Sequence, residues 1–202
     1  MIVGVAIALC VLATHPAHVL ASDDAVAEAF AGETAEAVIA LLKNSNPEQR
    51  KQEFLKIFVS KVDIRRVARF ALGQYARTPT EDQLKEYINI LKEFITKVYV
   101  SRLSDYSDAM VKITDSTNKG SRGKEVIVKS HITMAGKDQS VNLNWWLLRE
   151  DGGYKIFDLQ VAGIWLAQEQ RATFVSILKK GDGKFPVLLS HLRKQIENAS
   201  KT

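Results

Sequence analysis

The stretch YKIFDLQVAGIWLAQEQRATF, residues 154–174, decides the fold. Its first half alternates between two faces, as a strand does. The alternation breaks at Gly163, where a residue without Cβ allows a sharp turn. From Leu166 onward the apolar residues recur at helical spacing. The sequence therefore predicts a strand that runs directly into an amphipathic helix, with Trp165 at the corner.

The run just before this stretch alternates in the same way and predicts a hairpin. Residues 151–153 read Asp-Gly-Gly, which suits a three-residue loop with a glycine in the left-handed region. This loop would place Trp146 opposite Asp158 on a mixed face. The other face would be strongly apolar, because a register slip by one residue would mix the two faces. Its expected pairs are Leu147 with Phe157, Trp145 with Leu159, and Leu143 with Val161.

The rest of the chain predicts helices before and after an antiparallel sheet, hence an α+β fold. Asn46 is the expected N-cap of the second helix, and Thr80 with Gln83 forms an expected capping box before a long helix. Gly73 is expected to close a short helix that begins near Asp63. The expected elements are helices at 23–42, 47–58, 63–72, 80–106, 166–180 and near 186–196, and strands at 111–115, 125–134, 141–147 and 154–161.

The N-terminal segment 1–21 is uncharged and apolar, and small residues stand where a signal peptidase cuts. It predicts a secretory signal peptide that is cleaved after Ala21 and leaves residues 22–202 as a single domain. The alternative is an uncleaved anchor. However, the apolar run 2–13 is too short to span a bilayer.

The mature chain would offer little for catalysis or metal binding. The only Cys of the full sequence, Cys10, lies in the signal segment, so the mature chain would have no Cys and would keep only His131 and His191 of the four His. We therefore expect neither a metal nor a cofactor. The net charge of +5 is modest, and no basic run is interleaved with aromatic residues, so we do not expect a nucleic-acid partner. Asp158 is expected to accept structural hydrogen bonds, from Arg171 or from backbone amides.

Two separate motifs resemble the toluene-tolerance family, which contains the periplasmic phospholipid-binding component MlaC of the Mla lipid-transport pathway. The first motif matches at Lys155, Asp158, Gly163, Leu166, Arg171 and Phe174. The second matches at Val62, Asp63, Ala68, Arg69, Leu72, Gly73, Arg77 and Thr80. The chain departs from the family pattern at Ala76, Ala162, Trp165 and Gln170, where the family usually has Trp, an acid, Ser and Tyr.

The resemblance implies a curved antiparallel sheet of about four strands, covered by helices as in nuclear transport factor 2, with an internal apolar pocket. It implies a monomeric periplasmic shuttle without enzymatic activity. The shuttle would carry phospholipid between an outer-membrane lipoprotein complex and an inner-membrane ABC transporter with an MCE-domain ring. The basic residues Arg65, Arg66, Arg69 and Arg122 are candidates for partner docking.

We expect the acyl chains to lie between the apolar sheet face and the long helix. The expected lining comprises Leu91, Ile95, Val98, Leu143, Trp145, Leu147, Phe157, Leu159, Val161, Trp165, Leu166 and Phe174. The same residues could instead form a packed core, because apolar strand faces are normally packed. Other possibilities are a carrier of another lipid such as a hopanoid, an enzyme on the same fold, and a lipid-free interaction module.

Overall fold

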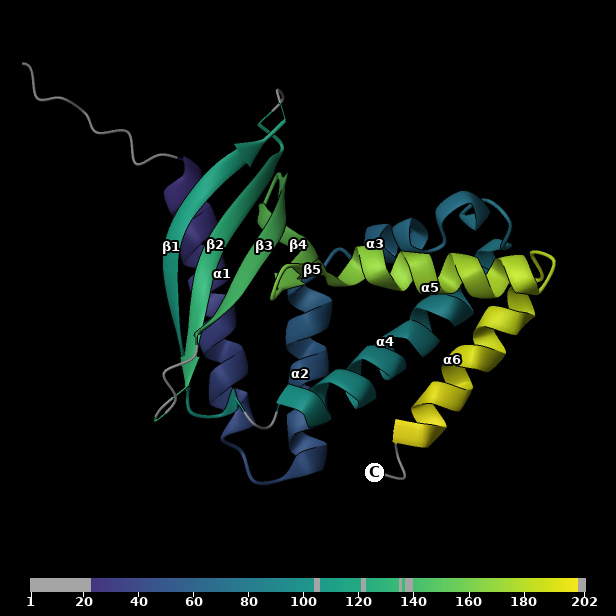
Figure 1. Cartoon of the computed structure of the whole chain (residues 1–202), viewed down its shortest axis with the longest axis horizontal. Helices are drawn as coiled ribbons and strands as arrows, with labels where there is room; N and C mark the ends of the chain where they lie inside the picture. Colours follow the sequence, from purple (N-terminus) through teal and green to yellow (C-terminus); the bar gives the residue numbers. More distant parts are fainter. Residues whose placement is uncertain (1–22, 104–105, 121–122, 135, 137–139, 200–202) are drawn as a thin grey trace, which may run out of the picture.

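The computed structural model describes residues 23–103, 106–120, 123–134, 136 and 140–199. The expected signal segment 1–21 lies outside the described residues. The sheet stands at one end of the molecule with α1 against it, and α3 to α6 form a helical body at the other end (Figure 1). Helix α2 lies between these two parts.

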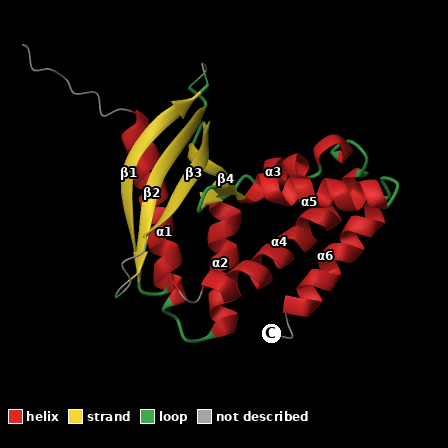
Figure 2. Ribbon diagram, viewed as in Figure 1, coloured by secondary structure: helices red, strands yellow, loops and turns green. Residues whose placement is uncertain are grey.

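The element types follow the expected order, as the ribbon coloured by secondary structure shows (Figure 2). The helices are α1 (Asp23–Leu42), α2 (Pro47–Lys61), α3 (Ile64–Ala71), the short 3-10 turn η1 (Gly73–Tyr75), α4 (Glu81–Leu103), α5 (Leu166–Lys180) and α6 (Phe185–Ala199). The strands are β1 (Ala109–Lys119), β2 (Glu125–Met134), β3 (Ser140–Glu150), β4 (Gly153–Val161) and β5 (Ile164–Trp165).

The strands form one antiparallel sheet in the order β1-β2-β3-β4-β5, which confirms the α+β prediction. The fifth strand has only two residues and pairs with the end of β4. Strand β1 is longer than the predicted strand 111–115, since it begins at Ala109 and continues through residues 116–119. No helix within the described residues combines the length and the apolar character needed to cross a bilayer.

Two predicted helix starts are confirmed by their cap geometry. The Asn46 side chain accepts hydrogen bonds from the backbone amides of Glu48 and Gln49 at 3.0 and 3.1 Å. The Thr80 hydroxyl accepts from the Gln83 amide at 3.2 Å, and the Gln83 side chain accepts from the Thr80 amide at 3.0 Å. These bonds satisfy amides that have no partner inside the helix, so the sequence fixes where α2 and α4 begin.

The predicted register of the β3–β4 hairpin is right in one half and wrong in the other. Trp145 lies opposite Leu159 and Trp146 opposite Asp158, as expected. Nearer the turn the register shifts, and Leu147 faces Ile156 instead of Phe157. The loop holds two residues rather than three, and a bulge at Phe157 takes up the extra residue.

The bulge also changes which face each β4 side chain occupies. Ile156 belongs to the apolar core of the sheet, whereas the predicted register places it on the mixed face. The Phe157 ring lies 4.8 Å from that of Trp146, on the mixed face. The expected apolar face therefore loses Phe157 and gains Ile156.

The edge of β4 that β5 leaves uncovered is closed by the segment before α3. Val62 forms a parallel bridge with Ile156, and the Asp63 amide donates to the Ile156 carbonyl at 3.1 Å. An open strand edge would expose unpaired backbone groups, so this bridge protects the sheet. It also fixes the start of α3 against the sheet, because the Asp63 side chain accepts from the Arg66 amide at 3.0 Å.

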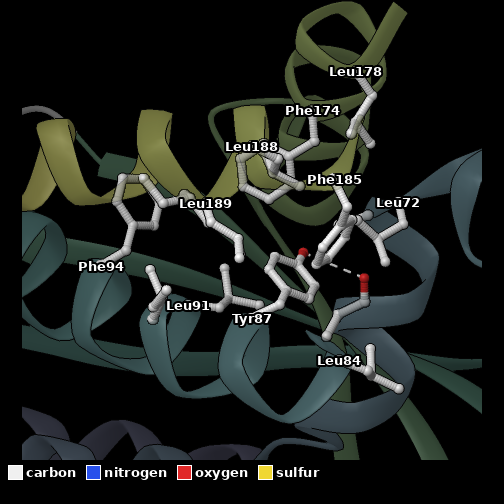
Figure 3. Packing of buried hydrophobic residues seen from close by; sticks show 14 of the residues in the cluster. Leu72, Leu84, Tyr87, Leu91, Phe94, Phe174, Leu178, Phe185, Leu188 and Leu189 are labelled. Carbon is white, nitrogen blue, oxygen red and sulfur yellow. Dashed lines mark hydrogen bonds between the residues drawn. The ribbon is translucent and has the colours of Figure 1, made fainter. Parts of the chain in front are cut away.

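The buried apolar residues form three clusters. The sheet cluster joins α1 to β2, β3 and β4 and includes Ala27, Ala31, Val126, Trp145 and Ile156. The helical cluster joins α3, α4, α5 and α6 and is built around Tyr87 (Figure 3). The bridging cluster joins the ends of α1, α2 and α4 through Leu41, Leu42, Phe54 and Val100.

Candidate functional site

Helix α1, and not α4, covers the apolar sheet face. Leu143, Trp145 and Leu147 are buried in the same cluster as Ala27 and Ala31. The small alanine side chains let the α1 backbone approach the strands closely. The expectation that α4 residues face these three side chains is therefore wrong, and this part of the sheet face is a packed core.

The expected lining residues of α4 and α5 belong to the helical cluster. Leu91 and Phe174 are buried there, and the Phe174 ring lies 6.3 Å from the Tyr87 ring. Ile95 and Val98 are partly buried at the edge of that cluster, and Ile95 also packs against the bridging cluster. Ile95 therefore lies where two apolar clusters meet.

Leu159 and Val161 are partly buried at the margin of the sheet cluster, and Leu166 is partly exposed at the start of α5. The structure thus does not bring the twelve expected residues together around one space. It distributes them over the sheet cluster, the helical cluster and the opposite face of the sheet.

That opposite face carries a group of aromatic rings where the sheet meets α3 and α5. The Trp146 ring lies 4.8 Å from the Phe157 ring and 5.7 Å from the Trp165 ring. The Phe157 ring lies 5.0 Å from the Phe70 ring, and the Arg171 guanidinium covers the Phe70 ring at 4.8 Å. These edge-on contacts connect the sheet to the helical body.

Asp158 lies in this region and is only 3% exposed. Its Oδ1 accepts hydrogen bonds from the Ala167 amide at 2.7 Å and from the Leu159 amide at 2.8 Å. The expected hydrogen bonds from backbone amides to Asp158 are thus confirmed. Arg171, the other expected partner, lies over the Phe70 ring instead. Burial raises the pKa of the Asp158 carboxyl, although the backbone bonds and the nearby Lys119 act against this shift.

Lys119, at the end of β1, lies over the Trp146 ring with its Nζ 2.8 Å from the ring centroid. Burial lowers the pKa of Lys119, and the charges of Glu125 and Asp158 partly offset this. The Trp146 indole donates to Glu125 at 2.9 Å. The aromatic rings and Lys119, Trp146 and Glu125 thus contact one another, whereas Asp158 Oδ2 is buried without a hydrogen-bond partner among the described residues.

Two recesses open on either side of α2. The first, of about 330 Å³, lies where α2, α3, α4 and the β3–β4 hairpin converge. It is lined by Val59, Val62, Asp63, Ile64, Arg65, Ile88, Lys92, Glu150 and Lys155. The second, of about 440 Å³, lies between α1 and α2 and is lined by Ala37, Ala40, Leu41, Asn44, Glu53, Lys56 and Ile57.

None of the twelve expected residues lines either recess. Sequence patterns gave no reason to choose these linings, because helix ends and a hairpin tip far apart in the chain form them. The sequence did contain one indication of the first recess, because two of its lining residues, Val62 and Asp63, belong to the second family motif.

The docking candidates of α3 are partly neutralised within the molecule. Arg65 and Arg69 both pair with Glu81 at 3.0 Å, and Arg66 pairs with Asp63 at 3.2 Å. The fourth candidate, Arg122, lies outside the described residues. In the part of the chain that the structure describes, no group of three or more His, Cys, Asp or Glu side chains is placed to hold a metal ion.

The architecture defines an α+β protein in which an open antiparallel sheet stands beside a separate helical body. The MlaC protein family matches residues 33–194, so the chain belongs to the MlaC family. The fold also matches a solved phospholipid-binding protein from Ralstonia solanacearum in complex with a phospholipid, with a TM-score of 0.74. The match covers 86% of this chain and 98% of that one, at 20% sequence identity. No curated protein sequence matched this chain.

Proposed function

We propose that the protein binds a phospholipid and shuttles it through the periplasm, between an outer-membrane lipoprotein complex and an inner-membrane MCE-type ABC transporter. Membership of the MlaC family supports this proposal, as does the fold shared with a phospholipid-binding protein. In this proposal residues 1–21 direct secretion and the mature domain acts as a binding protein, not as an enzyme.

The observation that carries the proposal is the division of the apolar interior around α2. Most domains of this size have one contiguous core with small satellites. Here the sheet cluster and the helical cluster are both large and separate, and the bridging cluster lies between α1, α2 and α4. Apolar surfaces that are not fused into one core can move apart to admit an apolar ligand.

Helix α2 is suited to such a movement. Phe54, at 9% exposed, is the only buried residue of this helix, and a recess opens on each side of it. The two recesses have volumes of about 330 and 440 Å³ and are open to solvent, whereas two acyl chains with roughly 30 methylenes must be enclosed away from water. We therefore propose that the tails enter beneath α2 and separate the clusters.

In this arrangement the residues at the cluster margins contact the tails directly. They are Ile95, Val98, Leu159 and Val161. The fully buried residues behind them, such as Leu91 and Trp145, hold the walls in place. Exposing roughly 30 methylenes to water would cost on the order of 20 kcal/mol, so a carrier must keep the tails enclosed during transfer.

The test is lipid uptake from vesicles. Protein stripped of lipid is incubated with vesicles that contain a fluorescent phospholipid, and the protein is separated and its lipid counted. We expect saturation near one phospholipid per protein, with the lipid recovered intact. Recovery of a lysolipid and a free fatty acid would indicate an enzyme. No uptake would favour the lipid-free interaction module, and uptake of a hopanoid alone would identify another cargo.

A further inference from the structure

The first recess, where α2, α3, α4 and the β3–β4 hairpin converge, lies at the boundary of two apolar clusters. Val62 packs against the sheet cluster, and Ile88 packs against the helical cluster. Both residues line the recess. If the clusters separate when a lipid enters, this recess lies at the mouth of the space between them.

The lining of the recess is part apolar and part charged. Its apolar residues are Val59, Val62, Ile64 and Ile88, of which Ile64 is buried and Val59 is 47% exposed. Its charged residues, called the rim below, comprise three cations and two carboxylates. A lining of both kinds suits a ligand that has an apolar part and a polar group. The charges available on the rim decide which polar group it can be.

The rim cations differ in how far they are already used. Arg65 is paired with Glu81 at 3.0 Å. Lys155 donates one hydrogen bond, to the Ser60 carbonyl at 2.5 Å, which leaves two of its three N–H groups. Lys92 has no acidic partner among the described residues.

The rim carboxylates reduce the positive charge without removing it. Asp63 is occupied as the N-cap of α3 and as the partner of Arg66. Among the remaining rim groups, Glu150 carries one negative charge, and Lys92 and Lys155 carry one positive charge each. The net charge of these three groups is +1, which matches the single negative charge of one phosphodiester.

We propose that this recess seats the phosphate of a glycerophospholipid headgroup, with Lys92 and Lys155 as its hydrogen-bond donors. The inference rests on the proposed function, because the tails must occupy the space behind the recess. The protein would then recognise the phosphate of its lipid as well as the acyl chains. A carrier without such a phosphate site would select its cargo by the acyl chains alone.

The experiment compares two lipids that share their acyl chains. Phosphatidylglycerol carries the phosphodiester, and diacylglycerol lacks it. We expect the wild-type protein to take up phosphatidylglycerol in preference. Lys92→Gln together with Lys155→Gln should lower phosphatidylglycerol uptake about five- to tenfold, because charged hydrogen bonds at a partly exposed site are lost. Diacylglycerol uptake should not change.

The control is Lys85→Gln, which removes one positive charge from the exposed surface of α4 outside the recess, where Lys85 pairs with Asp82 at 3.3 Å. It should leave the uptake of both lipids unchanged. If the double variant unfolds, as judged by circular dichroism, Lys92→Gln alone serves. The hydrogen bond that Lys92 accepts from the Thr96 hydroxyl uses its backbone carbonyl, which the substitution keeps.

The outcomes separate the two proposals. If the wild-type protein takes up neither lipid, the proposed function fails. If it takes up both, and the double variant keeps the wild-type preference for phosphatidylglycerol, the phosphate seat is refuted. If inorganic phosphate alone binds with the same dependence on the lysines while lipid uptake ignores them, the recess is a site for free phosphate and the headgroup assignment is wrong.

Discussion

Asp158 on β4 accepts a 2.7 Å hydrogen bond from the backbone amide of Ala167 in the first turn of α5. This bond ties the sheet to the helical body at a point where the chain turns from strand to helix. A carboxylate at a helix N-terminus also interacts favourably with the helix dipole. The same side chain is 3% exposed, so its ionisation carries a desolvation cost that the bond partly offsets.

The first prediction concerns pH. Burial raises the pKa of Asp158 in the folded protein above its usual value of about 4. The folded state therefore binds the proton more readily than the unfolded state, and this group adds stability as the pH falls between the two values. Asp158→Asn keeps an oxygen acceptor but has no charge. The stability of the Asn variant relative to wild type should therefore rise as the pH increases above about 4, the usual pKa of an aspartate carboxyl.

Urea unfolding of both proteins at several pH values measures this difference in the free energy of unfolding. The contributions of all other carboxylates cancel in the difference, because both proteins contain them. A relative stability that falls with rising pH would mean that the ionised carboxylate is favoured in the fold. Asp158→Ala removes the acceptor altogether. It should cost about 1–3 kcal/mol because two amides lose their partner.

The second prediction concerns Gly73, which ends α3 with a φ of +55°. A Cβ at this position would lie 2.7 Å from Cγ2 of Val175 in α5. Gly73→Ala should destabilise the protein by about 1–3 kcal/mol, through backbone strain and the displaced helix. Gly152→Ala is the control, because nothing lies within 4 Å of its Cβ position and its backbone is not left-handed. Equal thermal stability of the two variants would refute the close packing of α5 on Gly73.

The third prediction concerns the start of α4. Thr80→Ala removes the side-chain acceptor for the Gln83 amide and should cost about 1 kcal/mol in the free energy of unfolding. Thr78→Ala, two residues earlier, removes an exposed hydroxyl. It should stay within about 0.5 kcal/mol of wild type. A Thr80 variant as stable as the Thr78 variant would show that the capping box does not hold the helix start.

The fourth prediction concerns the proposed tail contacts. Leu159→Asp places a charge at the margin of the sheet cluster, where the tails are proposed to lie. Lipid uptake should fall more than about tenfold, because an unpaired carboxylate resists transfer into an apolar space. Thr117→Asp, on the exposed side of β1, should keep wild-type uptake. A folded Leu159 variant that still takes up lipid would remove this residue from the lining.

Local features of the fold could be predicted from the sequence because they depend on near neighbours. Asn46, Thr80 and Gln83 cap amides within three residues of themselves, so their spacing fixes where the helices begin. Alternation along β3 likewise placed Trp145 on the buried face. The bulge at Phe157 could not be seen, because a two-residue loop with a bulge and a three-residue loop without one give the same outer register.

The site was harder to predict because it depends on which helix covers which surface. Both α1 and α4 have apolar faces, and the sequence does not say which of them packs on Trp145. Alanine at positions 27 and 31 lets α1 pack closely there. The recess around Lys92 is less visible still, because its lining comes from elements that only the tertiary structure brings together.

The measurement that tests the central claim most directly is native mass spectrometry of the protein purified from a bacterial periplasm, with lipid extraction of the same sample. Our account predicts one adduct of phospholipid mass per protein, and the matching phospholipid in the extract. A protein at its bare mass with no lipid in the extract would contradict it, and would make a permanently closed interior the better description of the three clusters.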